Sequence, residues 1–78
     1  MRIFEVRNRA YKACVVVAPD QESAINKCVE VKHMRRGVPR RIKDITEEVV
    51  AEHPEVQSIM DAGDTCVIAC NEGKWEVQ

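Results

Sequence analysis

The sequence predicts a small α+β domain, a two-layer sandwich in which helices cover one face of a four-stranded antiparallel sheet, in the order ββαααββ. Residues 11–18 and 65–70 are apolar on both faces of a strand, as internal strands are. Each lies next to a shorter stretch that roughly alternates between apolar and polar residues, which indicates one hairpin at either end of the chain. Between the hairpins, apolar residues recur at helical spacing.

The first hairpin begins with a strand over residues 2–7, in which the rough alternation is typical of a half-exposed edge strand. Only residues 8–10 separate it from the strand over 11–18, and so short a connection favours antiparallel pairing. Three consecutive valines favour the extended conformation of this second strand. Pro19 cannot donate a backbone hydrogen bond to the sheet, so we expect the strand to end there.

Three helices are expected between the hairpins, over about residues 21–33, 44–52 and 54–62. Asp20 is well placed to cap the first helix, whose end Gly37 marks. The run Asp44-Ile45-Thr46-Glu47 resembles a capping box at the start of the second helix. We expect all three helices to bury their apolar residues on the same face of the sheet.

The second hairpin joins the strand over residues 65–70 to an edge strand over 74–77. Asn71-Glu72-Gly73 between them is typical of a tight turn with glycine in the left-handed conformation. No repeat, linker or low-complexity segment divides the chain, so we expect residues 1–78 to form a single domain.

Size and composition argue against several classes of protein. A chain of 78 residues leaves room for one core and none for an internal active-site cavity, and neither His33 nor His53 has a motif-defined nucleophile, so we expect no enzyme and no cofactor. Three aromatic residues are too few for a single-strand nucleic-acid reader that stacks bases. The longest apolar run, residues 13–18, is too short to cross a membrane, and Met1-Arg2 leads directly into the first strand, so we expect no signal sequence. We expect a cytoplasmic protein without membrane contact.

The four cysteines, Cys14, Cys28, Cys66 and Cys70, are expected to be free thiols that bind no metal. They form no CxxC pair, and the two histidines do not complete a zinc-site spacing. Cys66 and Cys70 are four residues apart on one strand, which separates their Cα atoms by roughly 13 Å, beyond the limit of about 7 Å for a disulfide.

Charge is segregated along the middle of the chain. Residues 27–43 contain seven basic residues and one acidic residue, a net charge of +6, and residues 44–64 contain seven acidic residues and no basic one, a net charge of −7. The acidic residues are Asp44, Glu47, Glu48, Glu52, Glu55, Asp61 and Asp64. The basic residues that could contact a partner are Arg35, Arg36, Arg40, Arg41 and Lys43.

Three interpretations of this pattern stay open. Each block can be the solvated side of its element, cross-paired in surface ion pairs of under about 1 kcal/mol each. The acidic block can imitate a phosphate backbone or dock on a basic groove of a complex that handles nucleic acid. The basic block can contact nucleic-acid phosphates without sequence specificity.

The stretch Phe4-Glu5-Val6, followed by Cys14-Val15-Val16-Val17-Ala18-Pro19-Asp20-Gln21-Glu22-Ser23-Ala24-Ile25, resembles small phage and mobile-element proteins of the DpnD/PcfM-like type. In those proteins a similar hairpin runs into an acid-capped helix, and the resemblance covers roughly the first third of the chain. In size, compactness and lack of a catalytic motif, the chain also resembles anti-CRISPR proteins. That resemblance implies a non-enzymatic inhibitor in the host cytoplasm, a monomer or weak dimer, which binds a type I CRISPR surveillance complex and blocks DNA binding. The alternative is a non-specific nucleic-acid-binding accessory protein that uses residues 35–43.

Overall fold

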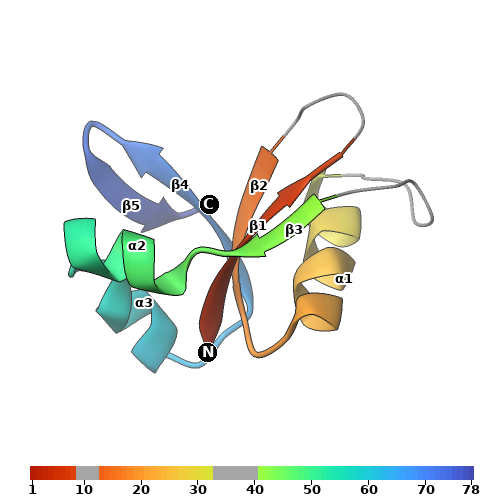
Figure 1. The fold of residues 1–78 in the computed structure, drawn as a ribbon, viewed down its shortest axis with the longest axis horizontal. Helices are drawn as coiled ribbons and strands as arrows, with labels where there is room; N and C mark the ends of the chain where they lie inside the picture. Colours follow the sequence, from red (N-terminus) through yellow and green to blue (C-terminus); the bar gives the residue numbers. More distant parts are fainter. Residues whose placement is uncertain (9–12, 33–40) are drawn as a thin grey trace.

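The computed structural model describes residues 1–8, 13–32 and 41–78, and within them the chain forms an open antiparallel sheet with three helices (Figure 1). The predicted α+β class is therefore confirmed. In chain order the elements are β1 (Arg2–Arg7), β2 (Ala13–Ala18), α1 (Gln21–Lys32), β3 (Arg41–Asp44), α2 (Thr46–Glu52), α3 (Val56–Asp61), β4 (Cys66–Asn71) and β5 (Lys74–Val77).

In the described part of the chain the sheet has five strands, in the order β3-β1-β2-β4-β5, where the sequence predicts four. Both predicted hairpins are present, β2 and β4 are internal as predicted, and β5 is an edge strand. The prediction that β1 is an edge strand is wrong, because β3 pairs with its outer side. The sequence pattern does not reveal β3, since its four residues contain a single apolar side chain, Ile42, and Asp44 fits the start of a helix.

The helices cover both faces of the sheet, so the predicted two-layer arrangement with helices on one face is wrong (Figure 1). Side chains alternate between the two faces of a strand, which places Phe4 and Val16 on one face and Ile3 and Val17 on the other. α1 packs on the first face, and α2 and α3 pack on the second. All four side chains are at most 4% exposed, because the apolar surface of each face has to be removed from water.

α1 begins as predicted. The backbone N–H of Ser23 donates to Asp20 Oδ1 at 2.8 Å, and the N–H of Ala24 donates to the carbonyl oxygen of Asp20 at 3.1 Å. Hydrogen bonds from the backbone and side chain of Ser23 lower the pKa of the Asp20 carboxyl, as expected for an acid that caps a helix. The helix reaches Lys32, and the predicted cap at Gly37 lies outside the described residues.

α2 begins at Thr46, two residues later than predicted, and the predicted capping box is not formed. Asp44 is the last residue of β3, and its Oδ1 accepts hydrogen bonds from the Thr46 backbone N–H at 3.0 Å and the Thr46 hydroxyl at 2.6 Å. Ile45 occupies the N-cap position, and its N–H donates to the Ile3 carbonyl at 2.9 Å, which extends the ladder between β1 and β3. α3 is shorter than the predicted helix over 54–62.

The turn between β4 and β5 has the predicted left-handed glycine. Its two central residues, Glu72 and Gly73, have φ angles of 52° and 81°. Two positive φ angles in a two-residue turn match the right-handed twist of the strands that it joins, so the turn fixes the register of Asn71 opposite Lys74.

Candidate binding surfaces

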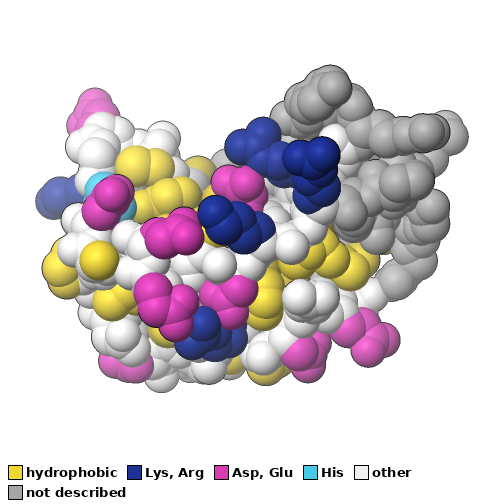
Figure 2. Space-filling model, viewed as in Figure 1, with side chains coloured by type: hydrophobic (Ala, Val, Ile, Leu, Met, Phe, Trp, Pro, Cys, Tyr) yellow, Lys and Arg dark blue, Asp and Glu magenta, His cyan; other side chains and the backbone are white. Residues whose placement is uncertain are grey.

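Pairing of β3 with β1 gathers basic side chains at one end of the sheet. Arg41 lies directly opposite Arg7, and Lys43 lies directly opposite Glu5. We call Arg7, Arg41 and Lys43 the basic surface. All three residues are exposed, and strand alternation puts them on the face that α2 and α3 cover farther along the sheet. Figure 2 shows dark blue side chains gathered near the start of β3.

Two carboxylates partly neutralise the basic surface. Glu5 Oε1 is 2.8 Å from Arg7 Nε, and Glu48 Oε1 is 3.6 Å from Lys43 Nζ. Within the described part of the chain, no carboxylate forms an ion pair with Arg41. The basic surface therefore keeps an excess of positive charge, centred on the two opposed arginines.

Both opposed arginines lie in stretches of the sequence that contain no acidic residue. Residues 6–19 and 31–43 contain no Asp or Glu and hold nine of the 12 Lys and Arg residues. Arg7 belongs to the first stretch and Arg41 to the second, so the ladder between β1 and β3 joins the two acid-free stretches.

Of the predicted basic residues, the structure places Arg41 and Lys43 on β3, and Arg35, Arg36 and Arg40 lie outside the described residues. Arg7 is the member of the basic surface that the sequence did not predict. The alternation of residues 2–7 put its side chain on the polar face, but only the pairing with β3 shows which charge stands beside it.

The predicted acidic residues are spread over four consecutive parts of the chain. Asp44 ends β3, α2 carries Glu47, Glu48 and Glu52, Glu55 precedes α3, Asp61 ends it, and Asp64 lies in the following loop. All seven are exposed, whereas Val49, on the same helix as three of them, is buried. We call Asp44, Glu47, Glu48 and Glu52 the acidic surface. Figure 2 shows magenta side chains over α2.

Arg2 lies within the acidic surface and binds two of its carboxylates. Arg2 Nε is 2.9 Å from Asp44 Oδ2, and Arg2 Nη2 is 2.8 Å from Glu47 Oε1. Partial burial by itself would raise the pKa of Asp44, but hydrogen bonds from Arg2 and Thr46 outweigh it and lower the pKa to about 2. The hydrogen bond from Arg2 also lowers the pKa of Glu47. These contacts join the start of β1 to the start of α2.

Other partners account for three more of the acidic residues. Lys43 approaches Glu48, His53 Nδ1 is 3.6 Å from Glu55 Oε2, and Gln57 donates to Asp61 Oδ1 at 2.9 Å. Glu52 and Asp64 have no ion pair among residues 1–8, 13–32 and 41–78. The interpretation of the charge blocks as cross-paired surface residues therefore explains part of the acidic block.

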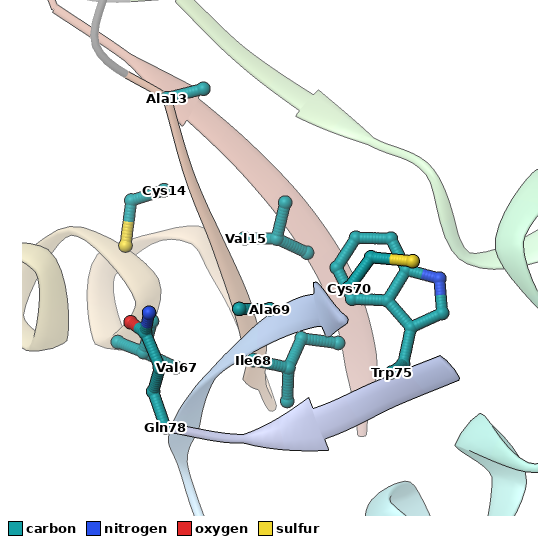
Figure 3. Close-up of a pocket in the computed structure, with 9 residues that line it drawn as sticks. All are labelled: Ala13, Cys14, Val15, Val67, Ile68, Ala69, Cys70, Trp75 and Gln78. Atoms are coloured by element: carbon teal, nitrogen blue, oxygen red, sulfur yellow. The ribbon is translucent and has the colours of Figure 1, made fainter. Parts of the chain in front are cut away.

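A shallow pocket of about 200 Å³ lies where β2 and β4 separate (Figure 3). Pairing between these strands stops at Val15 and Ile68, although both strands continue. Val15, Ile68, Cys70 and Trp75 lie on one side of the strands. Trp75 Nε1 is buried without an acceptor in the described part of the chain, and the ring meets His53 edge-on at 6.2 Å. Pockets that enclose drug-sized ligands measure about 300–1,000 Å³, so this one suits them poorly.

None of the four described cysteines, Cys14, Cys28, Cys66 and Cys70, forms a disulfide in the structure. Burial, and to a lesser extent the charge of Asp64, raise the pKa of Cys66. Within the described residues no three potential metal ligands form a group, and the absence of a bound metal stays a prediction. The same residues include no helix that is long and apolar enough to cross a membrane.

Comparison of the chain with protein-family models, with curated proteins and with solved structures finds no match.

Proposed function

We propose that the protein binds the phosphate backbone of nucleic acid through its basic surface, Arg7, Arg41 and Lys43, without reading the base sequence. The observation that carries this proposal is the placement of Arg7 directly opposite Arg41 in neighbouring strands. Like charges at directly opposed positions destabilise a sheet, so the pair works against folding stability. A phosphate bound between the two guanidinium groups offsets that repulsion.

Guanidinium groups suit this contact because each can donate two parallel hydrogen bonds to phosphate oxygens. Lys43, two residues along β3, adds a point charge on the same face. Phosphate contacts of this kind position a protein on nucleic acid and carry no sequence information. We therefore expect similar affinity for DNA duplexes of unrelated sequence and a steep loss of affinity as salt increases.

The test is fluorescence anisotropy with a labelled DNA duplex at several salt concentrations, with Arg7→Glu and Arg41→Glu as the variants. Each variant should bind at least roughly tenfold more weakly, and the slope of log K against log salt should fall by about 1 for each lost phosphate contact. Lys27→Glu is the matched control, because it makes the same charge change on α1, which packs on the face of the sheet opposite the basic surface. No binding by the wild-type protein at low salt, or equal binding by all four proteins, would refute the proposal.

A second candidate function is supported by the acidic surface. Glu47 and Glu48 remain 75% and 63% exposed although both take part in ion pairs, and Glu52 is exposed one turn after Glu48. Glu48 and Glu52, four residues apart, repel one another along the helix, so Glu52 does not serve the stability of α2. A partner with a basic groove would gain from them, and the resemblance implies the type I CRISPR surveillance complex as that partner.

This candidate is tested by co-purification of the tagged protein with that complex. The double variant Glu48→Lys, Glu52→Lys should lose the complex and keep its fold, whereas Glu72→Lys, in the turn of the second hairpin, should retain it. If the wild-type protein does not recover the complex, the second candidate fails, and the anisotropy experiment still decides the first.

A further inference from the structure

We infer that the protein forms a weak symmetric dimer in which the outer edge of β5 pairs antiparallel with β5 of a second copy. β5 is one edge of the sheet, and its outer side pairs with no other strand of the described chain. Lys74, Glu76 and Val77 are exposed, and Val77, at 58%, is one of two exposed large apolar residues among those described. The inference is independent of the proposed function.

The backbone of β5 shows which groups a second copy would meet. The N–H of Gln78 donates to the Val67 carbonyl of β4 at 2.8 Å. Hydrogen-bonding groups alternate in direction along a strand, so those of Lys74 and Glu76 also point to β4. The N–H and C=O groups of Trp75 and Val77 therefore point outwards, where an added strand can pair with them.

Charge selects one register for this pairing. A two-fold axis perpendicular to the sheet can place Trp75 opposite Trp75 of the partner subunit, with the outward backbone groups of both aligned for hydrogen bonding. Lys74 then lies opposite Glu76 of the partner subunit, and the symmetry forms this pair of opposite charges twice. The neighbouring register places Trp75 opposite Val77 of the partner subunit and Glu76 opposite the partner's Glu76, so it brings like charges together.

The other edge of the sheet does not suit a second copy. The outward backbone groups of β3 are those of Ile42 and Asp44, because Ile45 N–H points to β1. Pairing Ile42 with Ile42 of the partner subunit would place Arg41 opposite the partner's Lys43. Shifting the register by one pair would place Lys43 opposite the partner's Lys43. Like charges thus protect this edge from self-association, as charged residues commonly do on edge strands.

The dimer should be weak and depend on concentration. A strand of four residues offers few backbone hydrogen bonds, and its two pairs of opposite charges are exposed and screened by salt. Such an interface falls below the roughly 1,000 Å² that stable complexes usually bury.

Sedimentation equilibrium of the full chain over a range of concentrations tests the inference. The variants Lys74→Glu and Glu76→Lys each turn two attractive pairs into two repulsive ones, which should weaken dimerisation roughly tenfold. The double variant exchanges the charges and restores both pairs, so its dissociation constant should return to the wild-type value. A wild-type protein that stays monomeric up to about millimolar concentration would overturn the inference, as would assemblies larger than a dimer or a double variant that behaves like the single ones.

A proline substitution in β5 distinguishes a loss of edge pairing from a loss of folding. Val77→Pro removes an outward N–H and leaves the hydrogen bonds between β4 and β5 in place, so the monomer should fold, as shown by circular dichroism, and dimerisation should fall. Val77→Thr keeps the N–H and is the matched control. Equal dimerisation by the proline and threonine variants would contradict pairing through this edge.

Discussion

Arg7 and Arg41 occupy directly opposed positions in the ladder between β1 and β3, although both carry a positive charge. Arg41→Glu places opposite charges at this pair, so we expect the free energy of unfolding to rise by about 0.2–1 kcal/mol. Urea unfolding of the variant at low and high salt measures the gain, which should shrink as salt screens it. The same variant should bind DNA more weakly, and a variant that loses both stability and binding would show that Arg41 supports the fold.

Acid should destabilise the protein partly through Asp44. Its pKa is about 2 in the folded chain against 3.8 in the unfolded chain, so its contribution is complete above about pH 4 and is lost as pH falls towards 2. The side chain is 35% exposed, and solvent screening limits the contribution to below about 1 kcal/mol. Asp44→Asn should flatten the fall in unfolding free energy, measured by urea unfolding, between pH 4 and 2.

Thr46 connects β1 to the start of α2 through its hydroxyl group. Its Oγ1 accepts a hydrogen bond from the buried Ile3 N–H at 2.8 Å, and Thr46 itself is only 6% exposed. Thr46→Val keeps the shape and leaves this N–H unsatisfied, which should cost about 1–3 kcal/mol in chemical denaturation. Thr46→Ser keeps the hydroxyl, so its free energy of unfolding should fall less. If the serine variant were as unstable as the valine variant, packing of the side chain and not the hydrogen bond would explain the loss.

The four thiols should react with iodoacetamide in an order set by burial. Cys70 is exposed and should be alkylated first, Cys66 should follow slowly because burial and Asp64 raise its pKa, and Cys14 and Cys28 should react only on unfolding. Intact-mass spectrometry over time checks the order, and Asp64→Asn should speed the reaction of Cys66. A mass lower by two hydrogens, or a stoichiometric metal, would contradict four free thiols.

The turn of the second hairpin places a glutamate where the backbone is left-handed. Glu72 has a φ of 52°, and asparagine tolerates this conformation better than glutamate does. Glu72→Asn should therefore raise the free energy of unfolding by up to about 1 kcal/mol. Glu72→Val, whose branched side chain resists positive φ, should lower it, and thermal unfolding of the two variants should shift in opposite directions.

The sequence predicts the elements whose apolar residues follow a clear pattern. It does not predict β3, which is recognised only by its pairing with β1. The valines of β2 and the apolar run of β4 identify both internal strands, and Asp20 marks the start of α1. β3 has four residues and one apolar side chain, which is too short a pattern to separate a strand from a loop. Because β3 pairs with β1, β1 lies inside the sheet and not at its edge.

The assignment of helices to sheet faces fails for a related reason. Residues 2–7 do not alternate cleanly, since Ile3 and Phe4 are adjacent, and both prove to be buried, on opposite faces. Two adjacent buried residues in a strand require cover on both sides. The candidate site could be predicted only in part for the same reason. The charges along the chain predict Arg41 and Lys43, but only the pairing of β1 with β3 shows that Arg7 lies beside them.

Only three register pairs connect β2 to β4, and this short ladder affects how the protein unfolds locally. They connect partners that are distant in the chain, from Val15–Ile68 to Val17–Cys66, whereas the β4–β5 hairpin closes locally through its turn. Because this ladder is short and the pocket lies at its open end, we expect the second hairpin to open as a unit before the β1–β2 hairpin unfolds. Amide hydrogens of Ile68 and Cys66 should accordingly exchange faster than those of Val16 and Ala18, and the closure of this long-range ladder should be a late event in folding.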